Sequence, residues 1–211
     1  MKVSEPVIKR LPRYYRYLQD LISEGVSRIS SGELSRIMGI TASQIRQDLN
    51  CFGGFGQQGY GYNVKGLYEE IGKILGTNKE NELIVLGGGN LGRAICNYSN
   101  FKKRGFKINA VFDMDKNLIG KKINDIPIYD IENLEEYLKN NKTDIVVFAI
   151  PAVGVKKILD IVINSEIKGI WNFSYLDLKV PENIAMVNVH LSDSLMTLSY
   201  KIQQLDEENE L

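Results

Sequence analysis

The sequence predicts an α/β protein in two parts: a small helical part that opens the chain, followed by a parallel sheet with helices on both sides. Three observations predict it. Apolar residues recur at helical spacing from residue 11 to about 50, a glycine-rich segment follows the apolar run 83–86, and apolar runs then alternate with helical segments. The 211 residues also exceed the usual single-domain size of about 100 to 150.

Composition limits the classes of protein that this chain can be. An apolar fraction of 44% and 26 basic against 26 acidic residues are typical of a globular protein, although residues 1–65 carry nine basic against five acidic residues. The chain has no apolar run of about 18 residues and no apolar N-terminal stretch, so we expect a soluble, cytoplasmic protein. Cys51 and Cys96 lack partners at metal-ligand spacing, so we expect reduced thiols and no metal.

Helical spacing predicts three helices in the first part, on the apolar positions Tyr14, Tyr17, Leu18, Leu21, Ile22, Leu34, Ile37, Met38, Ile45 and Leu49. Ser30 with Glu33, and Thr41 with Gln44, each fit a capping box, in which a hydroxyl accepts from an amide and the later side chain reaches back. Gly39 suits the end of the preceding helix. The short turn predicts a helix-turn-helix.

The third helix has a polar face that could read DNA. Ile45 and Leu49 share one face with Ala42, and the opposite face carries Ser43, Arg46, Gln47 and Asn50. Arg suits the paired acceptors of guanine, and Gln or Asn suits adenine, in the major groove. The alternative is an ordinary solvated helix face.

Glycines and aromatic residues alternate in F52-G-G-F-G-Q-Q-G-Y-G-Y62, which predicts a strand, a tight turn and a return strand. Such a hairpin would be the wing of a winged helix-turn-helix domain; the alternative is a flexible linker. Its tip and the basic arm that includes Lys9 would contact phosphates or the minor groove. The predicted DNA contacts are Arg10, Arg13, Arg16, Ser43, Gln44, Arg46, Gln47, Asn50, Gln57, Gln58 and Tyr60.

The second part follows a polar junction at 77–82 and alternates strands with helices. Strands are predicted at 83–86, 108–112, 145–150, 170–173 and 186–189, with helices near 90–103, 132–140, 154–164 and 192–205. This alternation predicts a parallel sheet wound on both sides, as in a Rossmann-like domain.

Gly87, Gly89 and Gly92 reproduce the G-x-G-x-x-G pattern at the first strand-to-helix turn, where a bare backbone can approach a pyrophosphate at the helix N-terminus. Asp113 ends the next predicted strand, where a carboxylate would accept from ribose hydroxyls and repel a 2′-phosphate. The pattern therefore predicts NAD(H) rather than NADP(H). Asp115 is the alternative acid if the register differs by two residues.

The nicotinamide ring is expected among Tyr98, on the glycine-rich helix, and the strand ends 149–152 and 172–174. Each of these positions also fits plain packing, and for Phe148 and Phe173 packing in the core is the favoured interpretation. The predicted cofactor contacts are Gly87, Gly88, Gly89, Asn90, Leu91, Gly92, Tyr98, Asp113, Met114, Ala149, Ile150, Pro151, Asn172 and Phe173.

The last predicted helix carries an apolar seam, Leu191, Leu195, Leu198, Ile202 and Leu205, which needs a partner surface. That partner is either its own domain or a second subunit. We therefore expect a DNA-binding domain at 1–78 and a dinucleotide-binding domain at 79–190, followed at 191–211 by a helix that is a dimerisation helix if a second subunit covers its seam.

The chain resembles the redox-sensing transcriptional repressors called Rex over nearly its whole length. The motifs that carry the resemblance are L11-P-R-Y-Y-R-Y-L18, I45-R-Q-D-L49 with Phe52 and Gly53, G59-Y-G-Y62, G89-N-L-G92, F112-D-M-D115, Ala149-Ile150-Pro151 and W171-N-F-S174. The residues that depart from the family pattern are Gln47, Gln57, Gln58, Gly88, Lys116 and Tyr175. With fewer basic groups, we expect fewer neutralised phosphates and a shallower salt dependence.

The resemblance implies a homodimeric repressor that binds an inverted-repeat operator when NADH is scarce, releases it when NADH binds, and controls fermentation and respiration genes. It also implies that the last helix is exchanged between subunits, and that Arg16 and Asp193 form a charge pair that differs between the two states.

Two other classes of protein compete with a repressor. An NAD-dependent dehydrogenase would need a positioned proton donor or acceptor, but the only histidine, His190, lacks an evident partner for acid–base work. We therefore expect no enzyme activity. A CoA- or nucleotide-binding interaction module stays open, because similar folds host many functions.

Overall fold

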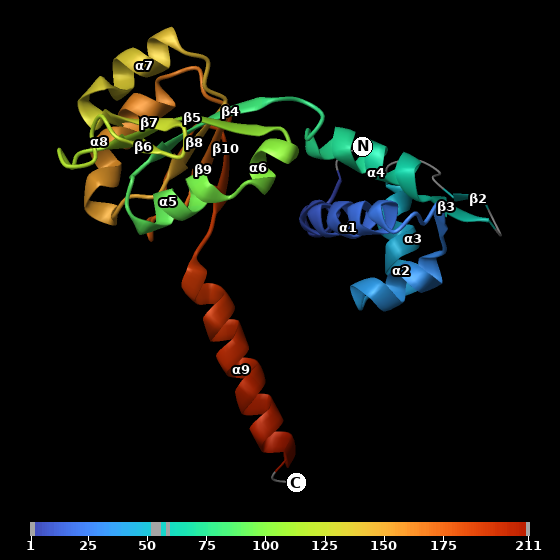
Figure 1. The fold of residues 1–211 in the computed structure, drawn as a ribbon. Helices are drawn as coiled ribbons and strands as arrows, with labels where there is room; N and C mark the ends of the chain where they lie inside the picture. Colours follow the sequence, from blue (N-terminus) through green and yellow to red (C-terminus); the bar gives the residue numbers. More distant parts are fainter. Residues whose placement is uncertain (1–2, 52–55, 58–59, 210–211) are drawn as a thin grey trace. The chain divides into compact units, whose positions relative to one another are not determined.

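The computed structural model describes residues 3–51, 56–57 and 60–209, with the backbone alone at 56, 57 and 209. The chain divides into two compact units, Met1–Lys79 and Glu80–Leu211, and each is described by itself (Figure 1). No helix in the described ranges has both the length and the apolar character needed to span a bilayer.

Unit 1 contains helices α1 (Glu5–Ser23), α2 (Ser31–Met38), α3 (Ala42–Asn50) and α4 (Val64–Leu75), and strands β1 (Arg28–Ile29), β2 (Gly56–Gln57) and β3 (Gly61–Asn63). The strands form an antiparallel sheet in the order β1-β3-β2. The three predicted helices and the paired strands of the hairpin are therefore present. Helix α1 begins earlier than predicted. Helix α4 is additional, since no element is predicted between the hairpin, which ends at 62, and the junction, which begins at 77.

The helix ends in unit 1 follow the predicted capping in part. Ser30 accepts from the Glu33 amide at 3.1 Å and the Glu33 carboxylate accepts from the Ser30 amide at 2.8 Å, so this capping box is confirmed. At the second predicted capping box, the Thr41 hydroxyl accepts from the Gln44 backbone amide as expected. The reciprocal bond is wrong, because the Gln44 side chain donates to a buried acid instead of reaching back to Thr41. Gly39 ends α2 with φ +63°, a left-handed conformation that favours glycine.

That buried acid is Asp48 on α3, whose side chain is fully shielded from solvent. Arg10 on α1 donates to both carboxylate oxygens at 2.7 Å, Tyr14 donates at 2.9 Å and Gln44 at 2.8 Å. Burial disfavours the charged form, but these hydrogen bonds outweigh it and hold the pKa of Asp48 below its ordinary value. Asp48 thus ties the polar helix α3 to α1.

Unit 2 contains one sheet in the order β10-β9-β8-β4-β5-β7-β6. Its strands are β4 (Asn81–Leu86), β5 (Phe106–Asp113), β6 (Lys122–Ile123), β7 (Ile126–Asp130), β8 (Ile145–Phe148), β9 (Gly169–Asn172) and β10 (Ala185–Asn188). All neighbours are parallel except β6, which is antiparallel to β7. The five predicted strands are confirmed, and the short hairpin β6–β7 extends the sheet beyond them.

The helices of unit 2 are α5 (Asn90–Asn97), α6 (Asn100–Lys103), the 3-10 turn η1 (Ile131–Asn133), α7 (Leu134–Asn140), α8 (Ala152–Ile163) and α9 (Leu191–Asn209). The single helix predicted near 90–103 is wrong, because the backbone is extended at Tyr98 (φ −78°, ψ 94°). Polar residues lie at this break, and the exposed Asn97 side chain accepts from Asn124 through its amide oxygen at 2.8 Å. Such side chains compete with the helical hydrogen bonds.

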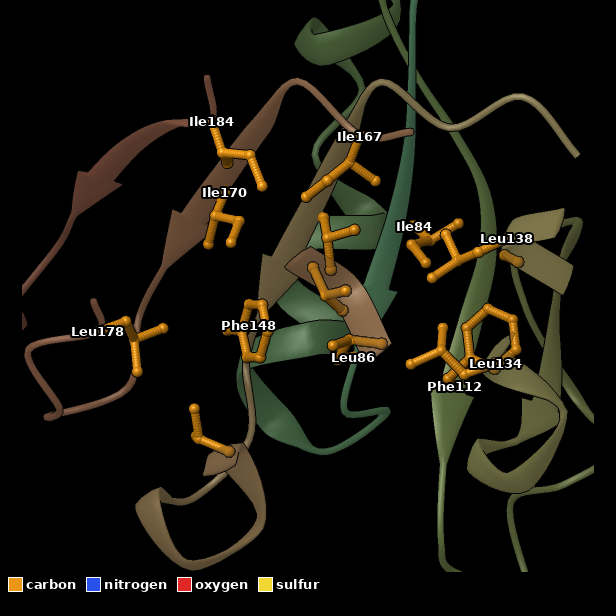
Figure 2. Close-up of a cluster of buried hydrophobic side chains, with 14 residues drawn as sticks. Ile84, Leu86, Phe112, Leu134, Leu138, Phe148, Ile167, Ile170, Leu178 and Ile184 are labelled. Carbon is orange, nitrogen blue, oxygen red and sulfur yellow. The ribbon is translucent and has the colours of Figure 1, made fainter. Parts of the chain in front are cut away.

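Helices cover both faces of the sheet, as the sequence predicts (Figure 1). On one face, Leu134 and Leu138 of α7 and Val155 of α8 pack over Ile84, Phe112 and Phe148, all buried; Figure 2 labels most of this cluster. On the other face, Ile95 of α5 and Phe101 of α6 lie over Val85 and Val111. These two layers fix the carboxyl ends of the strands at one edge.

We predict that Asp48→Ala destabilises unit 1 by about 2 to 4 kcal/mol, because it leaves the half-buried Arg10 guanidinium and the buried Tyr14 hydroxyl without their acceptor. Urea unfolding of the two proteins measures the loss, with the exposed Asp20→Ala as control. Because the pKa of Asp48 is lowered on folding, this stabilisation is present above about pH 4 and is lost as the pH falls further. Equal midpoints for Asp48→Ala and Asp20→Ala would contradict the role of Asp48.

Candidate functional site

The glycine-rich turn joins the end of β4 to the start of α5, as the sequence predicts. Gly87 has φ +101°, and a Cβ there would lie 2.5 Å from the Ala149 carbonyl oxygen; a Cβ on Gly92 would overlap the Gly87 carbonyl oxygen. A Cβ on Gly89 would meet nothing within 4 Å. Gly87 and Gly92 therefore serve close packing, whereas Gly89 keeps open the space before the amino end of α5, where unpaired backbone N–H groups can receive an anion.

The loops after β4 and β8 meet at this turn. Strand β4 lies between β5 and β8, and the chain runs first to β5 and later returns to β8, so the direction of winding reverses beside β4. The Ala149 amide donates to Leu86 at 2.9 Å, and Ala149, Ile150 and Pro151 then lead into α8. Ligands of open α/β sheets bind in the crevice at such a switch point.

Asp113, the last residue of β5, has its carboxylate against the glycine-rich loop. One oxygen accepts from the Gly88 amide at 2.6 Å and the other accepts from the Asp115 amide at 2.9 Å. The Asp115 side chain turns to Asn117, whose amide donates to it at 2.8 Å. Of the two candidate acids, the structure brings only Asp113 to the loop, and Met114 beside it is 77% exposed.

Four aromatic rings form a chain on the face of the sheet covered by α5. Tyr98 lies 4.7 Å from Phe101, Phe101 lies 5.7 Å from Trp171, and Trp171 lies 4.6 Å from Phe173, measured between ring centroids. Tyr98 is 48% exposed and Phe173 is partly buried, while Phe148 is fully buried in the core. The sequence prediction has Tyr98 on a helix; it lies instead at the break between α5 and α6, beside the ring of Phe101.

Asn172 is one of the predicted cofactor contacts, and its side chain also has a structural role. Its side chain is fully buried and both its amide nitrogen and its amide oxygen are hydrogen bonded within the chain. The sequence could not reveal this, because the partners come from a loop and from β10.

The polar face of α3 is exposed as predicted, and Ile45 and Leu49 are buried. The exposed side chains are Ser43, Arg46, Gln47 and Asn50. Arg46 reaches the Ser31 hydroxyl at 3.1 Å. Gln44, predicted to contact DNA, is half-buried and bonds to Asp48.

The predicted basic arm has two parts in the structure. Arg10 bonds to Asp48, and Arg13 donates to the Met38 carbonyl at the end of α2, so both hold α1 against its neighbours. Arg16 is exposed, and its guanidinium lies 5.7 Å from the Tyr17 ring.

The hairpin residues are described only in part. Gln57 pairs through its backbone with Gly61, Gln58 lies outside the described residues, and Tyr60 is 69% exposed. Arg28, which the sequence reasoning missed, lies over the Tyr60 ring at 5.8 Å. A lone arginine between two helices carries no pattern that would have identified it.

The cysteines and the histidine are the remaining side chains whose chemistry the sequence singles out. Cys51 and Cys96 are free thiols, and burial raises the pKa of Cys96 to about 11. Within the described ranges, no three His, Cys, Asp or Glu side chains are placed to hold a metal ion. His190 is half-buried, with its ring stacked 6.2 Å from Tyr175.

Two family models match this chain, and together they define its class of protein. Residues 2–50 match the family described as "Putative DNA-binding protein N-terminus", and residues 78–176 match the family described as "CoA binding domain". A DNA-binding segment joined to a nucleotide-type domain is the composition of a ligand-responsive regulator of DNA.

The chain belongs to the Rex family of redox-sensing transcriptional repressors. It is 55% identical to the redox-sensing transcriptional repressor Rex of Clostridium tetani, over 97% of both chains, and 52% identical to that of Clostridium acetobutylicum, over 97% of this chain and 95% of the relative. The crystal structure of RSP with β-NAD⁺ and operator DNA is 50% identical, with a TM-score of 0.92 over 100% of this chain and 97% of that one. The structure of RSP with β-NADH has 48% identity and a TM-score of 0.91 over 100% of this chain and 99% of that one.

We predict that Gly92→Ala lowers the stability of unit 2 by about 1 to 3 kcal/mol, because the new methyl group overlaps the Gly87 carbonyl and forces backbone shifts. Thermal unfolding followed by circular dichroism measures the loss. Gly154→Ala is the matched control, since a Cβ there lies 3.7 Å from Ile150 and alanine favours the helix. An equal melting temperature for Gly92→Ala and the wild type would contradict the close packing.

Proposed function

We propose that this protein is a homodimeric repressor that binds inverted-repeat operator DNA when NADH is scarce and leaves it when NADH binds. The observation that carries this proposal is the glycine-rich turn, where the open N-terminus of α5 at Gly89 lies beside Asp113, the acid suited to bind a ribose. The other unit of the same chain has a helix, α3, with an exposed polar face. Relatives of the same family support both halves, because RSP has been crystallised with operator DNA and with each form of the dinucleotide.

In the DNA-binding half, α3 is the recognition helix of a winged helix-turn-helix domain and the hairpin β2–β3 is the wing. Ser43, Arg46, Gln47 and Asn50 face the major groove, and the exposed position of all four supports this role. Phosphate and minor-groove contacts come from Arg13, Arg16, Gln57, Gln58 and Tyr60, joined by Arg28. Arg10 and Gln44 contribute by holding α3 through Asp48.

In the dinucleotide-binding half, the pyrophosphate lies against Gly87–Gly92, where Asn90 and Leu91 offer backbone N–H groups. Asp113 receives the adenosine ribose next to Met114 and repels a 2′-phosphate, so NAD(H) is favoured over NADP(H). The nicotinamide extends to the opposite side of β4, toward Ala149, Ile150, Pro151, Phe173 and Tyr98.

The dimer forms through α9, so that the segment 191–211 is a dimerisation helix distinct from the dinucleotide-binding domain at 79–190. Its apolar residues are more than half exposed in the single chain: Leu191, Leu195, Met196, Leu198, Tyr200, Ile202 and Leu205. A seam of this kind is covered by a second subunit, and Val187 on β10, 61% exposed, continues it. Exchange of α9 between subunits lets NADH change the spacing of the two recognition helices, which must stay about 34 Å apart for successive major grooves.

The regulatory setting follows from this mechanism. A repressor that reads the NADH pool acts in the cytoplasm on fermentation and respiration genes, and Arg16 with Asp193 forms a charge pair in one of its two states. The dehydrogenase hypothesis is not supported, because the Rex relatives are named as repressors. The other alternative, a CoA- or nucleotide-binding interaction module, would require that the protein binds CoA and does not bind NADH.

The proposal predicts that an inverted-repeat duplex binds the protein and is released by NADH but not by NAD⁺ or NADPH, measured by fluorescence polarisation at fixed salt. Arg46→Ala is expected to weaken specific binding by about 1 to 3 kcal/mol, as one lost base contact does, whereas Arg36→Ala, an exposed arginine on α2, keeps specificity. Tight NADH binding by a protein that recognises no duplex would overturn the proposal.

Gly89→Ala is expected to weaken NADH binding roughly tenfold or more, about 1.4 kcal/mol, because its methyl group occupies the space left for the pyrophosphate. Its φ of −70° suits alanine and no atom lies near, so the melting temperature of the ligand-free protein stays almost unchanged. ADP-ribose, which keeps the pyrophosphate and lacks nicotinamide, should lose affinity equally. Unchanged affinity for both ligands would show that the pyrophosphate lies elsewhere.

A further inference from the structure

Asn172 lies at the end of β9, on the side of the switch point opposite Asp113. The sheet order β9-β8-β4-β5 puts the ribose-type acid one strand from the glycine-rich turn on one side, and β8 and β9 on the other. Neighbouring strands lie about 4.8 Å apart, so the half of a dinucleotide that extends away from Asp113 passes over the ends of β8 and β9. The segment 173–176, directly after Asn172, therefore lies at the nicotinamide end.

The side-chain amide of Asn172 uses its full hydrogen-bonding capacity. Its nitrogen donates to the Leu176 carbonyl at 2.9 Å and to the Asn188 side-chain oxygen at 2.8 Å. Its oxygen accepts from the Ser174 amide at 3.0 Å and from the Ser174 hydroxyl at 2.7 Å. An asparagine has two N–H donors and two acceptor lone pairs, so no capacity remains for a ligand.

These bonds join two different parts of the chain. Ser174 and Leu176 belong to the segment at the nicotinamide end, whereas Asn188 is the last residue of β10. The Val189 amide also donates to the Asn172 carbonyl at 2.8 Å, and the chain passes from β10 into α9 at Leu191 (Figure 1). One buried residue thus holds both the segment 173–176 and the entry to α9.

We infer that Asn172 is a positioning residue that makes the nicotinamide-side segment 173–176 and the entry to α9 move together. When NADH displaces that segment, the side-chain amide of Asn172 carries the displacement to Asn188 at the end of β10, and so to the helix that joins the subunits. The inference rests on the proposed function, since it concerns how that same cofactor site controls DNA release. A buried, fully bonded amide suits this task, because it resists separation of the two parts.

The test measures coupling, which is the ratio of DNA dissociation constants with and without saturating NADH. Asn188→Ala removes the partner on β10; because Asn188 is exposed, this variant retains the fold and leaves Asn172 with its bonds to 174 and 176. Asn172→Ala removes all the side-chain bonds. We expect the ratio to fall roughly fivefold or more in each, within the usual range of allosteric coupling, while NADH affinity without DNA changes little for Asn188→Ala.

Asn183→Ala, an exposed asparagine before β10, is the matched control and should keep the wild-type ratio. Asn188→Ala removes the side-chain bond between Asn172 and Asn188, while the backbone bonds between β9 and β10 stay in place. A wild-type ratio in folded Asn188→Ala would therefore overturn the inference that this side-chain bond carries the displacement, even if Asn172→Ala failed to fold. Failure of the proposed function has a different signature: the wild-type protein itself would show no release by NADH, whatever its variants do.

Discussion

The close backbone contacts at Gly87 and Gly92 fix the geometry of the candidate dinucleotide site in the second unit. Gly87 lies against the Ala149 carbonyl and Gly92 against the Gly87 carbonyl, so β4, α5 and the end of β8 approach one another at backbone distance. That approach brings the loops after β4 and β8 together and sets Asp113 against the Gly88 amide. As a result, the open space beside Gly89 has Asp113 on one side and the segment 149–151 on the other.

The first unit depends on a buried charge for the same kind of positioning. Asp48 lies on the inward side of α3, and its bonds to Arg10, Tyr14 and Gln44 leave the outward side of that helix free. The arginines of this unit, which have the same predicted role in the sequence, therefore have different roles in the structure. Arg10 holds the helix, while Arg16 and Arg46 remain exposed for contacts with another molecule.

A sensor and an enzyme make different demands on a bound dinucleotide, and the residues of this chain suit a sensor. In the described part of the chain, the predicted nicotinamide side carries the rings of Trp171 and Phe173, and the one histidine stacks on Tyr175. What the arrangement offers instead is a short connection from the sheet edge, through Asn172, to a helix whose apolar seam is exposed. Binding energy can then change a subunit arrangement rather than a reaction barrier.

The sequence by itself determined the three helices of the first unit, the five main strands of the second, the glycine-rich turn with Asp113, and the polar and apolar faces of α3. Periodicity, caps and the G-x-G-x-x-G spacing are local signals, which is why they could be found without the structure. The tertiary structure alone decided which polar residues are structural. Asp48 bonds to Arg10, and Asn172 bonds to Asn188, across distant positions in the sequence. The sequence pattern of an acid or amide on a helix or strand is the same whether its side chain faces solvent or a buried partner. The break at Tyr98 and the hairpin β6–β7 were missed because both involve partners from other parts of the chain: Asn124 bonds to Asn97 beside the break, and β7 pairs with β5.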